Sequence, residues 1–235
     1  MVAGYSFQPR AWRLVLAGVA CAAAIALGNW QSGRAQQKIA LGARLDAALR
    51  APPLELSPSA DAASHVLQHV AARGSFAERY TVFLDNRLRG GRPGYEVVTP
   101  LHLAGSDAHV LVDRGWLAAP QRRSDEPSVR TPSGELRIDG LGLARLPRAL
   151  QAGAASAGKV RQNLDIEGYA AETGLRLLPL VIEQRSAADD GLLREWPRPD
   201  FGVEMNRSYA LQWYSFAVLA VALGVIFSFR RVAAP

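Results

Sequence analysis

YALQWYSFAVLAVALGVIFSF, at positions 209–229, decides the architecture, because it runs for 21 residues without a charged side chain. As an α-helix it would be about 32 Å long, which matches a membrane hydrocarbon core of about 30 Å. One glutamine and two serines interrupt it, whereas a soluble core helix of this length would need a whole polar face. We therefore predict a transmembrane helix over 209–229.

A second apolar run lies at positions 12–30, with a shorter uncharged centre of about 22 Å. Trp12 and Trp30 stand at its two ends, where aromatic belts meet the membrane interface. We interpret this run as a retained membrane anchor. A signal peptide cleaved at the small residues 24–26 is the alternative, and a lipoprotein is disfavoured because the leucine expected upstream of Cys21 is missing.

The placement of charge indicates the topology. Of the 27 basic residues, Arg10, Arg13, Arg230 and Arg231 flank the two apolar runs with no acid near them. The other basic residues and all 21 acidic ones lie within 31–207, which carries a net charge of only +2. The positive-inside rule then places both chain ends in the cytoplasm. Nucleic acid is not an expected partner, because no basic charge is concentrated on a folded face.

These features predict a multi-pass protein of a bacterial inner membrane with a periplasmic domain between its spans. The arginine- and alanine-rich composition is typical of a GC-rich bacterial genome, and the single cysteine excludes a disulfide framework. The predicted segments are a cytoplasmic tail at 1–11, a transmembrane helix at 12–30, a periplasmic α+β domain at 31–208, a transmembrane helix at 209–229 and a cytoplasmic tail at 230–235.

The pattern within the intervening domain predicts an α+β fold with a mostly antiparallel sheet or a partly closed barrel. The first helix should continue past the membrane until Pro52 and Pro53 stop it. A short helix is expected at 164–174, closed by a glycine. Strands are expected at 66–76, 80–84, 95–103, 108–116, 136–143 and 177–184.

Connections in this domain follow from glycine and proline. Turns are predicted at 89–94 and 131–134, and a tight corner at Gly115. The small, polar stretch 149–157 is the expected mobile loop. Pro197 and Pro199 are expected to stiffen the approach to the second span.

Four histidines are the candidate metal ligands. His65 and His69 have the i, i+4 spacing that would place both imidazoles on one face of a helix. No third ligand accompanies them, so ordinary surface or half-buried histidines are the favoured interpretation. His102 and His109 flank a hairpin loop and are expected to face each other. We predict no metal site.

Enzymatic motifs are missing from the sequence. It contains no Walker-type phosphate loop, no Gly-x-Ser-x-Gly elbow and no paired metal carboxylates. We interpret the charged pairs Asp113 with Arg114 and Asp189 with Asp190 as solvated or capping charges. The chain is therefore not expected to be an enzyme.

Polar and aromatic residues cluster where both apolar runs meet the outer membrane interface. If the two helices pack as a hairpin, these side chains converge there. One interpretation is an aromatic belt with snorkelling arginines. The other is a site for an amphipathic, partly membrane-buried ligand or for a partner helix. The residues are Trp30, Gln31, Arg34, Asn206, Arg207, Tyr209, Gln212 and Trp213.

Three motifs in order give the chain a family resemblance. They are LGNWQSGR at 27–34 followed by Lys38, GYEVVTPL at 94–101 with VLVDRGWL at 110–117, and YALQWY at 209–214. Together they resemble the Surfeit locus protein 1 family, the cytochrome c oxidase assembly factors. The motif residues that we single out are Trp30, Gln31, Arg34, Thr99, Pro100, Arg114, Gly115 and Trp116.

The resemblance implies an assembly factor that assists haem a delivery or the maturation of the haem-bearing oxidase subunit. Implied partners are an oxidase subunit, haem-synthesis or assembly proteins, and membrane lipid. Transient haem a contacts would fall on Asn206, Tyr209 and Trp213. The family typically has a histidine three residues before that tyrosine, and here the position is Asn206, whose amide is a poor iron ligand. A membrane adaptor that contacts oxidase subunits without binding haem is the alternative.

Overall fold

The structure, a computed structural model, describes residues 5–58, 61–120, 122, 125–149, 158–196 and 202–231. The chain divides into two compact units. Met1–Arg44 with Arg198–Pro235 forms a helical hairpin, and Leu45–Pro197 forms a barrel domain. Most of the predicted mobile loop at 149–157, together with Pro197 and Pro199, lies outside the described residues.

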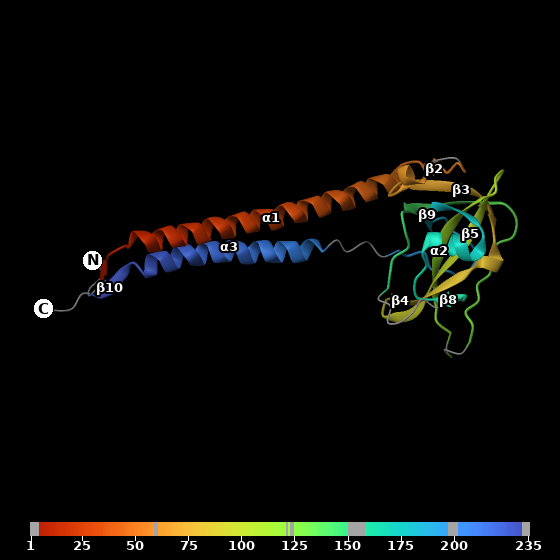
Figure 1. Cartoon of the computed structure of the whole chain (residues 1–235). Helices are drawn as coiled ribbons and strands as arrows, with labels where there is room; N and C mark the ends of the chain where they lie inside the picture. Colours follow the sequence, from red (N-terminus) through yellow and green to blue (C-terminus); the bar gives the residue numbers. More distant parts are fainter. Residues whose placement is uncertain are drawn as a thin grey trace. The chain divides into compact units, whose positions relative to one another are not determined.

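The helical hairpin contains two antiparallel helices that lie side by side, α1 (Ala11–Arg50) and α3 (Val203–Ile226) (Figure 1). Both are long and apolar enough to cross a membrane, by length and composition. Small residues let transmembrane helices approach closely, and several small residues are buried along the two helices of this hairpin. They are Ala24, Gly28, Ala35, Ala210, Ala217 and Gly224.

The ends of the second helix differ from the prediction of 209–229. α3 begins at Val203, after Gly202 in a left-handed conformation, and Glu204 in its first turn complements the helix dipole. It ends at Ile226, so the last three residues of the predicted helix are not helical. β10 (Phe229–Arg231) instead pairs antiparallel with β1 (Tyr5–Phe7). The two chain tails thus pair with each other, which neither tail signals alone.

The barrel domain is built from one sheet. Among the described residues its strand order is β2-β3-β7-β9-β6-β5-β4-β8. The strands are β2 (Leu54–Glu55), β3 (His69–Phe76), β4 (Val82–Arg89), β5 (Arg92–Leu103), β6 (Ala108–Ala118), β7 (Leu136–Leu143), β8 (Val160–Arg161) and β9 (Arg176–Gln184).

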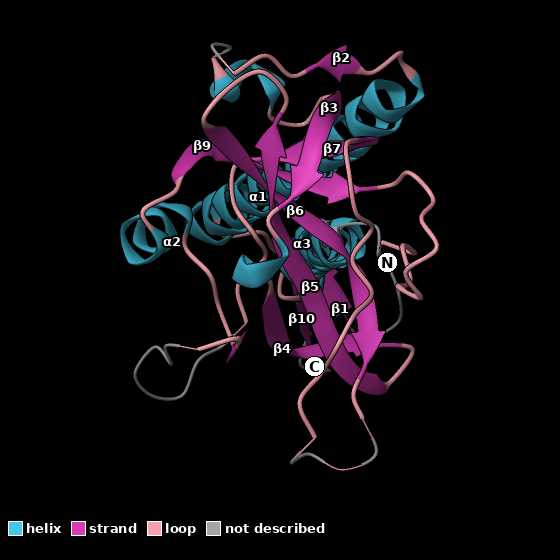
Figure 2. Cartoon of the chain, turned by 90° about the vertical axis from the view of Figure 1, so that its right-hand side faces the viewer, coloured by secondary structure: helices cyan, strands magenta, loops and turns pink. Residues whose placement is uncertain are grey.

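A further pairing between β3 and β5 closes β3, β7, β9, β6 and β5 into a five-stranded barrel (Figure 2). Within this ring the neighbours are antiparallel, apart from the parallel pair β6 and β9. The predicted fold class, two apolar helices flanking a mostly antiparallel α+β domain, is confirmed. The barrel is closed rather than partly open, because β3 pairs on both of its edges.

Alternate side chains of the barrel strands enter two different cores. On β9, Leu180 and Ile182 join a cluster contributed by all five barrel strands, which is the barrel interior. Val181, between them, packs in a second cluster with Tyr169 of α2 (Ile166–Thr173). Successive residues of a strand face opposite sides, so β9 is buried on both faces and reads as an uninterrupted apolar run.

Two strands begin later than predicted: turn residues at 66–68 precede β3, and a short 3-10 turn takes Tyr80 ahead of β4. The turn η1 (Ala62–His65), capped by Asp61, precedes β3, and η2 (Glu78–Tyr80) precedes β4. The predicted helix at 164–174 is confirmed as α2, with Asp165 as its N-cap and Gly174 as its left-handed C-cap.

The hairpin between β4 and β5 is tighter than the predicted turn at 89–94. Gly90 and Gly91, with φ of +55° and +76°, form the turn alone, and β5 already begins at Arg92. Two consecutive positive φ angles are typical of the two-residue turns that match strand twist, and glycine adopts them without strain.

Candidate functional site

One end of the helical hairpin carries a polar junction formed by Gln31, Lys38 and Asn206. Lys38 Nζ donates to Asn206 Oδ1 at 2.6 Å, and Asn206 Nδ2 donates to Gln31 Oε1 at 2.5 Å. Lys38 Nζ also lies 3.5 Å from the Gly202 carbonyl oxygen at the start of α3. Both ends of the Asn206 carboxamide are therefore engaged, and the junction cross-links α1 to α3.

Tyr214 forms a second cross-link in the hairpin. Its hydroxyl donates to Asn29 Oδ1 at 2.9 Å and lies 3.2 Å from Ser32 Oγ. Its ring covers Gly28 so closely that a Cβ at that position would be 2.5 Å from a ring carbon. Tyr214 is the last residue of the YALQWY motif, but it was not among the predicted site residues. The glycine within the LGNW motif was the available signal, because close approach of a ring requires a missing side chain.

The predicted interface aromatics lie around this junction. Trp30 is 59% exposed and Tyr209 is 47% exposed. Trp213 is half-buried and meets Phe216 edge-on at a centroid distance of 5.7 Å. Arg34 is also exposed. The structure thus brings Gln31 and Asn206 into contact, and it leaves aromatic surface accessible beside them.

A haem-iron ligand at position 206 would not fit these contacts. The carboxamide oxygen accepts from Lys38 and its nitrogen donates to Gln31, so neither atom is directed toward a ligand. A carboxamide is in any case a weak iron ligand beside imidazole. All the histidines of the chain belong to the barrel domain, at His65, His69, His102 and His109.

Those histidines have ordinary structural contacts. His69 Nε2 lies 3.2 Å from Asp139 and its Nδ1 is 2.8 Å from the Ala51 carbonyl oxygen. The rings of His102 and His109 face each other at 4.8 Å, as predicted. Burial, and then the neighbouring His102, lowers the pKa of His109. Within the described part of the chain, no group of three or more His, Cys, Asp or Glu side chains could hold a metal ion.

Arg114 is a fully buried ion-pair partner, which corrects our interpretation of it as a solvated charge. Its guanidinium donates to Asp190 Oδ2 at 3.0 Å, to Thr131 Oγ1 at 2.9 Å and to the Arg130 carbonyl oxygen at 2.8 Å. Burial alone would raise the pKa of Asp190, but hydrogen bonds from Arg194 and Arg114 outweigh it and lower that pKa. Asp190 is likewise buried, whereas Asp189 is exposed as expected.

The interpretation of Asp113 as a solvated or capping charge is also wrong, because its side chain is buried. Burial raises the pKa of Asp113 well above its usual range, and the charges of Glu96 and Glu183 raise it further. Glu96 is buried as well and pairs with Arg87 and Arg89 at 2.9 and 3.0 Å. Buried carboxyls are destabilised when ionised, so this face of the sheet favours a protonated Asp113.

The predicted corner at Gly115 is wrong, because β6 continues to Ala118. Gly115 instead follows a β-bulge, where the register against β5 shifts, and its φ is +141°. A Cβ there would lie 2.8 Å from the Leu193 carbonyl oxygen. Trp116, the next residue, exchanges backbone hydrogen bonds with Leu193, and its indole donates to the Arg87 carbonyl oxygen at 2.8 Å.

The remaining central motif residues also make structural contacts. The hydroxyls of Thr99 and Thr81 are 3.0 Å apart in the interior, and the Pro100 carbonyl oxygen accepts from Ala77 N at 2.8 Å. Together with Arg114, Gly115 and Trp116 they hold the strands in place. Packing and hydrogen bonding therefore account for the motif residues at 94–101 and 110–117 that we singled out in the barrel domain.

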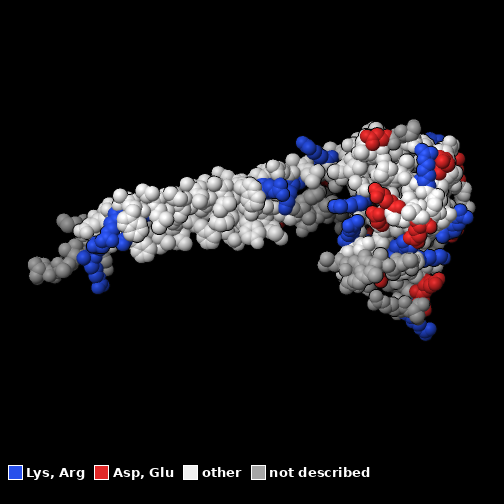
Figure 3. Space-filling view, viewed as in Figure 1, with Lys and Arg blue, Asp and Glu red and all other residues white. Residues whose placement is uncertain are grey.

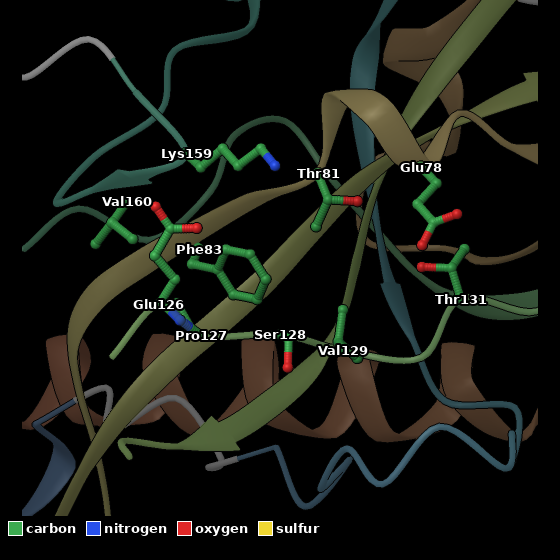
Figure 4. Close-up of a pocket in the computed structure, with 10 residues that line it drawn as sticks. All are labelled: Glu78, Thr81, Phe83, Glu126, Pro127, Ser128, Val129, Thr131, Lys159 and Val160. Atoms are coloured by element: carbon green, nitrogen blue, oxygen red, sulfur yellow. The ribbon is translucent and has the colours of Figure 1, made fainter. Parts of the chain in front are cut away.

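A cavity of about 500 Å³ opens on the barrel domain between η2, β4, β8 and the segment before β7 (Figure 4). Glu78 and Thr131 point toward each other at one side, and Phe83 lies near the centre of the view. Glu126 and Lys159 add one charge of each sign. The cavity is suited to a polar ligand, although none of the predicted site residues lines it.

Comparisons with known proteins connect these features. The model of the SURF1 family matches residues 18–218, from within α1 to within α3. A SURF1-like protein of Monosiga brevicollis is 30% identical over 126 residues, which cover 49% of this chain and 48% of that protein. The chain thus spans about half the length of this curated relative.

Fold and site together define a protein with two candidate membrane helices that flank a closed β-barrel domain. The three motifs seen in the sequence all lie inside the region matched by the family model. The chain belongs to the SURF1 family, which confirms the resemblance noted from its sequence.

Proposed function

We propose that this chain is an assembly factor for cytochrome c oxidase that acts without catalysing a reaction. Membership of the SURF1 family is consistent with an oxidase assembly role and is the observation that carries the proposal. The match runs from within the first apolar helix, through the barrel, to within the second, so it concerns more than one motif. The proposed location is a bacterial inner membrane, with both termini cytoplasmic and the barrel domain in the periplasm.

The finer proposal is that the chain assists the maturation of the haem-bearing subunit, with haem a as a transient cargo. Support comes from the exposed aromatic surface of Trp30 and Tyr209 and the half-buried Trp213 beside the polar junction. Aromatic side chains can hold a porphyrin by stacking and burial. The proposed partners are an oxidase subunit and the proteins that make or insert haem.

A second candidate function is a membrane adaptor that contacts oxidase subunits and never carries haem. One observation favours it: the carboxamide of Asn206 is engaged by Lys38 and Gln31, so this position offers nothing to iron. The adaptor would then use the hairpin and barrel surfaces to hold partner proteins together.

Deletion and complementation test the assembly role. A host that makes haem a and lacks this chain should lose oxidase activity and the haem a absorption of its membranes, and expression of the full chain should restore both. A deletion host with normal oxidase activity and a normal haem a spectrum would refute the assembly role for either candidate.

Haem retention separates the two candidates. Asn206→His should increase the haem that copurifies with the full chain, because imidazole binds iron well. Asn206→Ala should change it little, while Tyr209→Ala and Trp213→Ala should each weaken retention by about 1–3 kcal/mol. If the parent chain binds stoichiometric haem and Asn206→Ala abolishes that binding, the conclusion that Asn206 does not ligate iron would be contradicted. No haem in any variant, with assembly intact in cells, would favour the adaptor.

A further inference from the structure

A groove of about 500 Å³ lies between α1 and α3, near the end of the helical hairpin where β1 pairs with β10. Figure 1 marks this end by the label β10. Its floor consists of small residues from both helices, Ala17, Ala20, Ala220 and Gly224. A Cβ on Gly224 would lie 3.0 Å from Ala17 Cβ, so the two helices pack closely beneath the groove. The floor is therefore tightly packed, and the empty space lies above it.

Large apolar side chains form the walls of this groove. Trp12 and Leu16 rise from α1, and Phe227 stands opposite at the end of α3. Each of the three is at least 60% exposed. Small residues flanked by large exposed apolar ones leave a channel open toward the hydrocarbon of a membrane. Such a channel suits a flexible hydrocarbon chain.

Positive charge gathers at the mouth of the groove. Arg13 lines it, and its Nη1 donates to the Phe227 carbonyl oxygen at 3.0 Å. A guanidinium carries five N–H donors and recognises phosphate through paired ones. The pairing of β1 with β10 holds Arg230 and Arg231 opposite the N-terminal tail, close to where Arg10 leads into α1.

The sequence places no aspartate or glutamate close to these arginines. The chain has no Asp or Glu before Asp46 and none after Glu204. Figure 3 shows Lys and Arg side chains at this end of the hairpin, with no acidic side chain beside them in this view. An apolar groove with the guanidinium of Arg13 at its mouth is complementary to one class of molecule, an acidic amphiphile.

We propose that this groove binds one anionic phospholipid, with an acyl chain on the small-residue floor and the phosphodiester at Arg13. Basic pockets between transmembrane helices on the cytoplasmic side recognise acidic lipid head groups in this way. Juxtamembrane arginines each strengthen the attraction to an anionic lipid, and their effect adds to the burial of the acyl chain. The bound lipid would fix the hairpin in the membrane, independently of any role in oxidase assembly.

Lipid titration into the full chain, delipidated in neutral detergent and observed by native mass spectrometry, tests the proposal. One phosphatidylglycerol should bind in preference to phosphatidylcholine. Arg13→Gln should weaken phosphatidylglycerol binding about fivefold. Arg34→Gln, which removes an exposed arginine elsewhere on α1, should leave it unchanged.

Filling the groove is the second arm of the test. Ala20→Leu should reduce binding of phosphatidylglycerol, whereas Ala23→Leu, at an exposed position of α1 that does not line the groove, should not. Equal binding of the two lipids, or equal effects of Arg13→Gln and Arg34→Gln, would overturn the proposal. A dimer or a copurifying protein that Ala20→Leu releases would also overturn it, because the occupant would then be a polypeptide.

Discussion

Gly115→Ala should destabilise the barrel domain through two separate effects. The φ of Gly115 is +141°, a region that side-chain-bearing residues avoid at a cost of about 1–3 kcal/mol. The new Cβ would also lie 2.8 Å from the Leu193 carbonyl oxygen and 3.0 Å from Leu192 Cβ. Relieving that crowding requires a backbone shift of the bridge between Trp116 and Leu193, at about 1–3 kcal/mol.

The expected total loss is about 2–6 kcal/mol, set against a typical domain stability of about 5–15 kcal/mol. A domain of this size loses about 3 °C in Tm per kcal/mol, so Tm should fall by about 6–18 °C. Thermal unfolding of the full chain in detergent, followed by near-ultraviolet circular dichroism, measures the change.

Gly174→Ala is the matched control for the backbone effect alone. Gly174 also has a positive φ, +71°, but nothing lies within 4 Å of a Cβ added there. Its loss should be about 1–2 kcal/mol, or about 3–6 °C. If Gly115→Ala melts no lower than Gly174→Ala, the close approach of Leu193 does not constrain the bulge and our explanation of this motif fails.

Three other predictions follow from buried charge and from topology. The pKa of Asp113 is raised in the folded state, so the stability that this carboxyl contributes falls as pH rises from its unfolded pKa of about 4 through its folded pKa. Asp113→Asn should therefore stabilise the chain at neutral pH and flatten its pH–Tm profile. A lower Tm of the variant at pH 7 would contradict this. Asp190→Ala leaves the guanidinium of Arg114 without its buried partner and should lower the free energy of unfolding, measured with denaturant, by about 3–5 kcal/mol. A loss below about 1 kcal/mol would mean that water reaches this ion pair. Reporter fusions should read periplasmic after Arg34 and cytoplasmic after Ala234, and periplasmic activity at Ala234 would refute the two-span topology.

The strand and helix positions were largely predictable because their signals are local. The β7 prediction at 136–143 matches the observed strand, and Gly174 ends α2 as expected. The wrong predictions concern strand boundaries, where two local conformations compete for the same residues. Tyr80 was assigned to a strand, yet the 3-10 turn Glu78–Tyr80 precedes β4, and the continuous pairing of β6 replaced the corner at Gly115.

The candidate site was predictable only as a region. Sequence alone indicated that Gln31 and Asn206 would meet if the spans packed as a hairpin. It did not indicate that Lys38 would donate a hydrogen bond to the Asn206 side-chain amide, or that the ring of Tyr214 would cover Gly28. These outcomes depend on the rotation of one helix against the other, which a hydropathy pattern does not encode.

The sequence by itself determined two apolar helices, their flanking charges and a strand-rich domain between them. Segment length, hydropathy and the spacing of apolar residues are properties of contiguous residues, so they can be read from the sequence without knowledge of the fold. The tertiary structure alone decided that β3 closes the barrel on β5 and that Arg114 meets Asp190, 76 positions later, in the interior. Burial of a charge depends on which distant partner arrives to neutralise it, and only the folded chain specifies that partner.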